Sequence, residues 1–401
     1  MQIANLTFAR FIAAFLVFLH HSTGLQQQIA VTIGEPPASL MRNGFVGVTF
    51  FFILSGFILS HVYFGSLDRL RLATVGIFYV HRLTRIVPLW LVLSAPIIGL
   101  AVYHGHADKG VWIYLAFLQA WSSDLWVAFG PYISVAWTLS VEMFFYALFP
   151  FIGWSIYRLS PGNPNRVWLP VCLVAIAVPL LGALFFEFSA LKDLANFDPN
   201  SAHRWLYRNP LLRIGDFVFG IGLFLAFSWS RSALSSPARK TWGLGLLLGG
   251  LVVAVYLMST FPPSHWTFDF AYVIPFGAIV LGSALVETCD RPLAIGSRFL
   301  VLLGEASFAF YLIHVTYGLE LMKPLRALFG ANEFLFSLFA LVFITATSIG
   351  LFVVIERPAQ KALRALMPAR SHNSRLAGRE REPATAPRAP SPVRPNEAAV
   401  A

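Results

Sequence analysis

Arg10 and His21 lie in the first apolar segment, and their types and spacing suit chemistry inside a membrane. They are eleven residues apart, which in an α-helix is three turns plus roughly 20°, so they share one helix face and lie about 16 Å apart. An ionisable group inside a bilayer costs several kcal/mol and is by itself a functional hypothesis. His21 suits a general base, although a histidine at the outer interface is unexceptional. His20 points about 100° away from it.

A second basic pair, Arg82 and Arg85, lies at the expected cytoplasmic start of the third apolar segment, beside His81 and Pro88. Two guanidiniums three residues apart form a fork on one helix face, which suits a phosphate or a carboxylate. Anchoring by positive charge at the cytoplasmic surface explains the same residues. The pair alone therefore indicates an anion site only weakly.

Acidic residues also fall within the apolar segments. Glu142, in the stretch 137–146, needs a cation or a proton at that depth, and a buried pair with an arginine that merely fixes packing is the alternative. Arg213 and Asp216 are three residues apart, and we favour a local ion pair over catalysis for them. Glu356, directly before Arg357 and Pro358, is interpreted first as marking the end of a helix.

Ser307 and His314 are seven residues apart, so one helix face carries both. The chain has no Walker loop, no G-x-S-x-G elbow and no H-E-x-x-H motif. Its ten histidines are scattered, and its two cysteines, Cys172 and Cys289, exclude a disulfide scaffold and a cysteine-based zinc site. We expect no metal.

The composition identifies the elements that must position these residues. Of the 401 residues, 57% are hydrophobic and 12% charged, against roughly 45–50% and 25% in soluble domains. So few charges cannot cover a soluble globule of this size, and so many apolar groups exclude disorder for the bulk of the chain. The composition predicts a membrane protein with many spans.

A bilayer core requires about 20 mostly apolar residues per helix. We therefore predict an all-α polytopic membrane protein with about ten transmembrane helices. An eleventh stretch, 111–128, is short and carries Gln119 and Asp124, and we expect it to be one interfacial or re-entrant helix. The predicted spans are 4–24, 44–64, 86–103, 135–157, 167–187, 210–229, 242–260, 270–288, 299–320 and 335–356.

The charge distribution sets the expected orientation. The formal net charge is +10, and residues 357–401 hold nine Lys/Arg and three Glu, a net charge of +6. With ten spans, this tail and the more basic loops fall on the N-terminal side, which the positive-inside rule makes cytoplasmic. We expect both termini inside, a membrane domain over 1–360 and a largely disordered Pro/Ala/Arg-rich tail over 361–401. No nucleic-acid partner is expected.

Taken in order, these blocks resemble the membrane acyltransferase-3 family, which includes O-acetyltransferases of bacterial surface polysaccharides. The resemblance covers about residues 1–360. It rests on Arg10 and His21, on the blocks 44–57, 78–88 and 137–150, on Arg213 with Asp216 and Gly220, on Ser307 to His314, and on Glu356 with Pro358.

The resemblance implies transfer of an acyl group, usually acetyl, from cytosolic acyl-CoA to a sugar hydroxyl at the outer face of the bacterial inner membrane. It implies that His21 is essential, that Arg10 belongs to the same signature, and that Arg82 and Arg85 bind the donor. Glu142 is a candidate to orient His21 or to bind acceptor hydroxyls. His21 acts either as a base or as a covalent carrier.

Many relatives carry a further extracytoplasmic domain, and we expect this chain to be a stand-alone form whose outer segments 25–43, 104–134 and 188–209 face a carbohydrate or lipid-linked acceptor. Trp121, Trp126 and Tyr132 are candidates for stacking on sugars, although an interfacial aromatic belt explains them better. The alternatives are a transporter or flippase for a lipid-linked sugar or organic acid, and an inert scaffold. Only the enzyme requires acyl-CoA.

Overall fold

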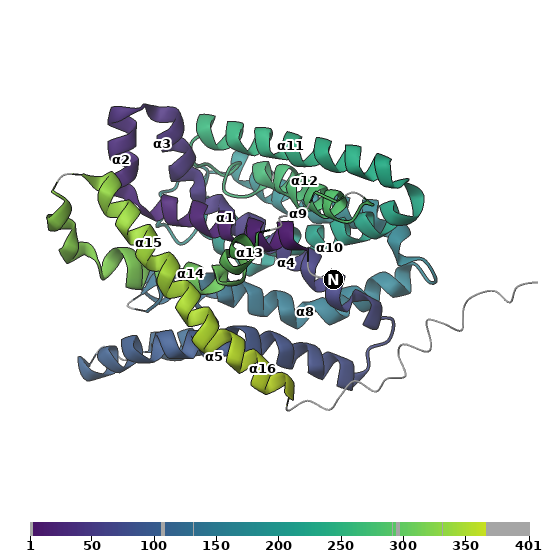
Figure 1. Ribbon diagram of the computed structural model, residues 1–401, viewed down its shortest axis with the longest axis horizontal. Coiled ribbons are helices and arrows are strands. Elements are labelled where there is room, and N and C mark those ends of the chain that lie inside the picture. Colours follow the sequence, from purple (N-terminus) through teal and green to yellow (C-terminus); the bar gives the residue numbers. More distant parts are fainter. Residues whose placement is uncertain are drawn as a thin grey trace, which may run out of the picture.

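A computed structural model describes residues 3–105, 109–130, 132–290, 292–293, 297–330 and 332–365, and over these ranges the chain is built from helices, without strands. Nine helical segments of the described chain are long and apolar enough to cross a membrane, and a bent pair makes a tenth. The fold class predicted from the sequence, a polytopic all-α membrane protein, is confirmed. Figure 1 shows the helices packed side by side in one bundle.

The spans follow the predicted order. Most observed ends lie within a few residues of the predicted ones. The ninth span is bent by 47° between α13 and the segment Ser307–Glu320. The spanning segments are built on α1 (Ala4–His21), α4 (Gly47–Tyr63), α5 (Leu72–Tyr103), α8 (Trp137–Leu159), α9 (Trp168–Glu187), α10 (Pro210–Ala233), α11 (Ser236–Thr260), α12 (Phe270–Glu287), α13 (Arg298–Glu305) with α14 (Ser307–Ile313) and η7 (His314–Glu320), and α15 (Glu333–Leu351).

The third span differs most from the prediction. Helix α5 has 32 residues and begins at Leu72, fourteen residues before the expected start at 86. Its length of about 48 Å exceeds a bilayer core of about 30 Å, so part of it protrudes. Residues 72–80 of α5 are themselves mostly apolar, but His81, Arg82 and Arg85 interrupt the apolar run, so the sequence placed the start of the span after these basic residues.

The stretch 111–128 contains no helix long enough to span a bilayer core, and it is not the single short helix that we expected. It forms α6 (Lys109–Leu115), η3 (Gln119–Trp121) and α7 (Leu125–Phe129). Phe117 has a φ of +55°, the left-handed region that ends a helix, and Asp124 precedes α7. Gln119 is buried and donates its amide to the carbonyl of Ala136 at 2.8 Å, which ties the stretch to the start of α8.

Four helices form the inside of the bundle. In α4, α8, α10 and α12, 61–72% of the span is buried, against 22–33% in α1, α5, α9, α11 and α15. Helices α4 and α10 touch through two glycines, since a Cβ on Gly56 would overlap the carbonyl of Phe217 and one on Gly220 would overlap the carbonyl of Ile53. Small residues at such crossings allow backbones in a membrane to approach closely.

Helix α1, which carries Arg10 and His21, is fixed near its first residue by α12. The Glu287 carboxylate accepts hydrogen bonds from the backbone N–H groups of Ala4 at 2.6 Å and Asn5 at 2.8 Å. These are among the donors that a helix start leaves unsatisfied, and a negative charge there also complements the helix dipole. Gly304 of α13 meets the α1 backbone at Thr7. These contacts set the position of the Arg10–His21 face.

Candidate active site

The face of α1 that carries Arg10 and His21 packs alongside a second functional face, on α14 and the start of η7. Ser307, Tyr311 and His314 follow one another at i, i+4 and i+7, so they line one side of their helix. Ser307 and Arg10 line the same cavity, and His314 contacts His21. The structure therefore pairs the candidates of the first span with those of the ninth, residue by residue.

A cavity of about 520 Å³ lies at the Arg10 half of α1. Helices α1, α4, α5, α8 and α14 all contribute to its wall, and α5, which contributes both arginines, lies at one edge of the bundle in Figure 1. The charged and titratable residues of the wall are Arg10, His61, Arg82, Arg85, Glu142, Tyr146 and Glu305.

The two α5 arginines are only partly partnered by the protein. An Arg82 amino group donates to the Tyr63 hydroxyl at 3.1 Å, and the guanidinium lies 5.2 Å from the Tyr63 ring centre. Arg85 approaches the Glu356 carboxylate at 3.6 Å, and this glutamate is nearly fully buried. Among the described residues, Arg82 Nε and one terminal nitrogen of Arg85 have no hydrogen-bond acceptor. Buried donors without acceptors favour an anion as the missing partner.

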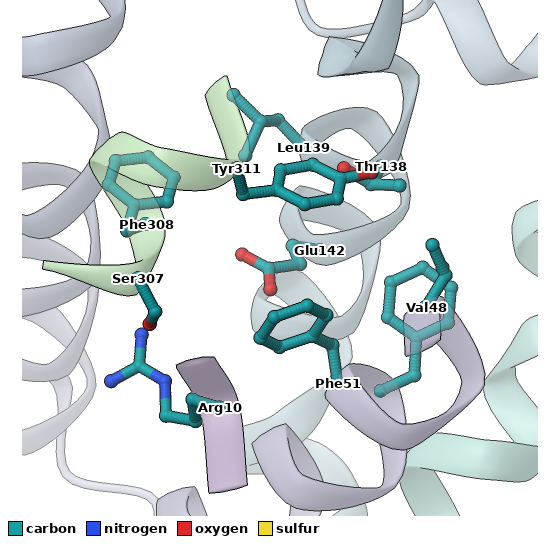
Figure 2. Close-up of a pocket in the computed structure, with 10 residues that line it drawn as sticks. Arg10, Val48, Phe51, Thr138, Leu139, Glu142, Ser307, Phe308 and Tyr311 are labelled. Carbon is teal, nitrogen blue, oxygen red and sulfur yellow. The ribbon is translucent and has the colours of Figure 1, made fainter. Parts of the chain in front are cut away.

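A narrow space of about 50 Å³ continues from this cavity between Arg10 and Glu142. Figure 2 shows the Arg10 guanidinium beside Ser307 and the Glu142 carboxylate between Tyr311 and Phe51. Glu142 accepts a hydrogen bond from Tyr146 at 3.0 Å, and Ser307 donates to the carbonyl of Gly304 at 2.7 Å. Within the described chain, no carboxylate lies within 4.0 Å of Arg10. Glu142 lines the two Arg10 cavities and neither of those that His21 lines, which speaks against a direct contact that orients His21. Binding of acceptor hydroxyls, the other role expected for Glu142, stays a prediction.

His21 lies at the other end of α1 and lines two further cavities. One, of about 550 Å³, has a charged rim; the other, of about 180 Å³, is lined largely by aromatic rings. His20 lines both as well, but its Nδ1 is bound to the carbonyl of Arg42 at 2.6 Å. The charged residues of the rim are Arg42, Glu320, Lys323, Arg326 and Glu333, and the aromatic chamber includes Phe129, Trp137, His203, Tyr207 and Tyr311.

Tyr311 separates the two halves of the site. Its side chain lines both the 50 Å³ space with Arg10 and the 180 Å³ chamber with His21, and its ring packs edge-to-face on Phe51 with centres 5.8 Å apart. The cavities thus follow one another along α1, from Arg82 and Arg85 to Arg10, then past Tyr311 to His21.

Arg213 and Asp216 lie away from these cavities and form the ion pair that we favoured from their spacing, at 3.0 Å. Sequence reasoning missed Asp269, which binds the other Arg213 amino group at 2.5 Å, and Thr49, which accepts from Arg213 at 2.8 Å. All four side chains are buried. The network joins α4, α10 and the start of α12, and we assign it to packing.

The aromatic residues near His21 are not those that the sequence suggested. Trp121 packs edge-to-face on Phe144, and Tyr132 is buried against Tyr114 with ring centres 4.7 Å apart; the Trp126 side chain lies outside the described part. Trp137 and Tyr207 line the chamber instead. The sequence feature that could have identified Trp137 as a site residue is its position at the start of the segment that carries Glu142.

His203 borders the same chamber from η6 (His203–Arg208), outside the spanning segments. Burial, followed by repulsion from the Arg208 guanidinium, lowers the pKa of His203 to about 4. It is therefore neutral near pH 7. Over the described residues, no three His, Cys, Asp or Glu side chains gather in a way that would hold a metal ion.

A family profile described as an acyltransferase domain matches residues 3–355. Acyltransferase MdmB of Streptomyces mycarofaciens is 27% identical over 337 residues, which are 80% of this chain and 81% of that protein. O-acetyltransferase OatA of Staphylococcus aureus (strain NCTC 8325 / PS 47) is 22% identical over 312 residues, 71% of this chain but 48% of that protein. No solved structure matches the chain.

Proposed function

The chain belongs to the acyltransferase domain family, and from that premise we propose that it moves an acyl group, in the first instance acetyl, from cytosolic acyl-CoA to a hydroxyl on a carbohydrate or glycolipid at the outer face of the inner membrane. The single observation that carries this proposal is the row of cavities along α1, with an arginine fork at one end and His21 at the other.

The donor enters the 520 Å³ cavity in this proposal. Coenzyme A is a long molecule with phosphates at one end and the thioester at the other, and Arg82 and Arg85 offer guanidinium donors to the phosphates. The pantetheine arm then lies along the narrow space beside Arg10, which we assign to donor binding. Glu142 balances the Arg10 charge from across that space. The arginine end of α1 is the cytoplasmic end in this orientation.

The acceptor enters the 550 Å³ cavity at the other end and presents a hydroxyl to His21. In direct transfer, the imidazole nitrogen that faces the cavity takes the hydroxyl proton while the oxygen attacks the thioester carbon. The C–S bond breaks, and the thiolate receives the proton from the imidazole. In covalent transfer, the same nitrogen first takes the acyl group as the thiolate leaves. The hydroxyl oxygen then attacks the acyl carbon, the bond from that carbon to the imidazole nitrogen breaks, and the hydroxyl proton ends on the thiolate. Both routes require the thioester to pass Tyr311.

The test is transfer of radiolabelled acetyl from acetyl-CoA in membranes that contain the protein. We expect wild type to label a glycan or glycolipid fraction, and His21→Ala to lower the initial rate by a factor on the order of 100 or more. His20→Ala is the matched control, since His20 lines the same two cavities and is bound through its Nδ1 to a backbone carbonyl; it should retain most activity.

Two results would count against the proposal. If wild type labels nothing and binds no acetyl-CoA, the donor assignment is wrong, and a transporter of a lipid-linked sugar becomes the better account of the charged cavities. Equal labelling by wild type and His21→Ala would keep the enzyme but remove His21 from its chemistry.

A further inference from the structure

His314 lies directly behind His21, out of reach of either substrate. It is fully buried, and it lines neither of the cavities that contain His21. Its Nε2 is 3.3 Å from His21 Nδ1, and the two ring centres are 5.1 Å apart. His314 is also the first residue of the π-helical segment η7, a local distortion that is frequent at functional sites.

The backbone partners of the two rings determine where their protons lie. His314 Nδ1 is 2.6 Å from the carbonyl of Tyr311, and a carbonyl only accepts, so His314 Nδ1 carries a hydrogen. In the neutral ring, Nε2 is then an acceptor. His21 Nδ1 is 2.9 Å from the carbonyl of Val17 and also faces His314 Nε2. Both neighbours of His21 Nδ1 are acceptors, so it carries the hydrogen that they share.

We infer that His314 is a positioning residue that holds His21 with its proton on Nδ1 and its lone pair on Nε2, the nitrogen that reacts. The inference rests on the proposed function, because it assigns a role to His314 in the same reaction. It serves the base and the covalent route equally, since each uses the lone pair of Nε2 and leaves the proton on Nδ1. His314 donates no atom to the product.

The same contact favours the charged intermediate. When His21 Nε2 takes a proton or an acyl group, the ring becomes positive and its Nδ1–H becomes a stronger donor to Val17 and His314. In many hydrolases a buried carboxylate stabilises the positively charged imidazole in this way. Here no described carboxylate is hydrogen-bonded to His21, and a neutral imidazole takes that place. A protonated His314 would instead point an N–H at the N–H of His21.

The experiment compares two amides at position 314. In His314→Gln the side-chain oxygen reaches about as far as Nε2 and accepts from His21 Nδ1. In His314→Asn the amide ends near the Nδ1 position, so the contact with Tyr311 survives and the one with His21 is lost. The readout is the initial rate of radiolabelled acetyl transfer from acetyl-CoA in inside-out vesicles, as a function of acetyl-CoA concentration. Thermal unfolding in detergent accompanies each variant.

We expect His314→Asn to lower kcat by about 10- to 100-fold, which is the range typical when a histidine that binds a metal loses the group that orients its ring. The KM for acetyl-CoA should not change. His314→Gln should recover most of that loss. A merely structural role predicts that the two amides behave alike, in activity and in melting temperature. Equal loss in both, or wild-type activity in both, would overturn the inference. An inactive wild type would instead overturn the proposed function itself.

Discussion

Arg82 is the residue that tests donor binding most cleanly. It contacts Tyr63 but no described carboxylate, so its removal leaves no buried acid unpaired. We expect Arg82→Gln to raise the KM for acetyl-CoA by about 10- to 100-fold, the equivalent of about 1.5–3 kcal/mol for a lost charged hydrogen bond, and to change kcat little. Steady-state kinetics in inside-out vesicles measure both constants.

The control for this variant is Arg158→Gln. Arg158 lies at the end of α8 and stacks on Trp154, outside the donor cavity. Arg85→Gln is the informative contrast, because it also leaves Glu356 buried without its cation, so it should lower the melting temperature as well as affinity. An unchanged KM in Arg82→Gln would contradict the proposed phosphate fork.

His203 provides a prediction about pH. Its pKa is about 4 in the folded protein and about 6.5 in an unfolded chain. The unfolded state therefore binds a proton first as pH falls, and the stability associated with the neutral ring is present above pH 6.5 and lost between pH 6.5 and 4. At pH 5 this loss is at most about 2 kcal/mol. Thermal unfolding should show that stability falls less between pH 7 and pH 5 in His203→Gln than in wild type. An identical fall in the two proteins would contradict the assigned pKa.

At the scale of single residues, the sequence identified most of the charged candidates but not all of their partners. Arg10, His21 and Glu142 were recognisable because ionisable groups are rare inside apolar segments. Glu142 proved to face Arg10 rather than His21. Asp269 and His314 acquired their roles only through contacts with residues 56 and 293 positions away. Such pairings depend on how helices pack, and no local pattern encodes them.

At the scale of elements, the ten spans were predictable because a bilayer demands long apolar helices. The start of α5 was not, because His81, Arg82 and Arg85 interrupt its apolar run, and neither was the break of the stretch 111–128, because a single turn leaves no mark in the apolar pattern. The close approach of α4 and α10 at Gly56 and Gly220 was also hidden, because a glycine in a membrane helix looks the same whether it packs or faces lipid.

The glycines differ in what a substitution should do. Gly220→Ala places a methyl group against the α4 backbone and should lower the yield of monodisperse protein in detergent and its melting temperature. Gly245→Ala on α11, which meets no atom within 4 Å, should be neutral or should stabilise the helix by up to about 1 kcal/mol. Size-exclusion chromatography and thermal unfolding measure both. Equal tolerance of the two changes would show that the α4–α10 contact is looser than described.

At the scale of the whole molecule, the bundle places an arginine-bearing cavity and a histidine-bearing cavity at opposite ends of one helix, with Tyr311 between them. A pair of arginines alone could simply anchor the helix at the membrane surface, and a histidine alone is unexceptional at the membrane–water interface. Their alignment along α1 is what favours transfer of an acyl group from one side of the membrane to the other. A sugar transporter would need neither acyl-CoA nor a pair of arginines that binds its phosphates.

The most direct test of this account is the sidedness of transfer in sealed vesicles. Radiolabelled acetyl-CoA is added outside inside-out and right-side-out vesicles that carry equal amounts of protein, and the labelled product is then treated with a membrane-impermeant deacetylating reagent. We predict labelling only in inside-out vesicles, with the product protected in the lumen until detergent is added. Labelling from both sides, or a product that is accessible on the side of the donor, would contradict transfer across the membrane.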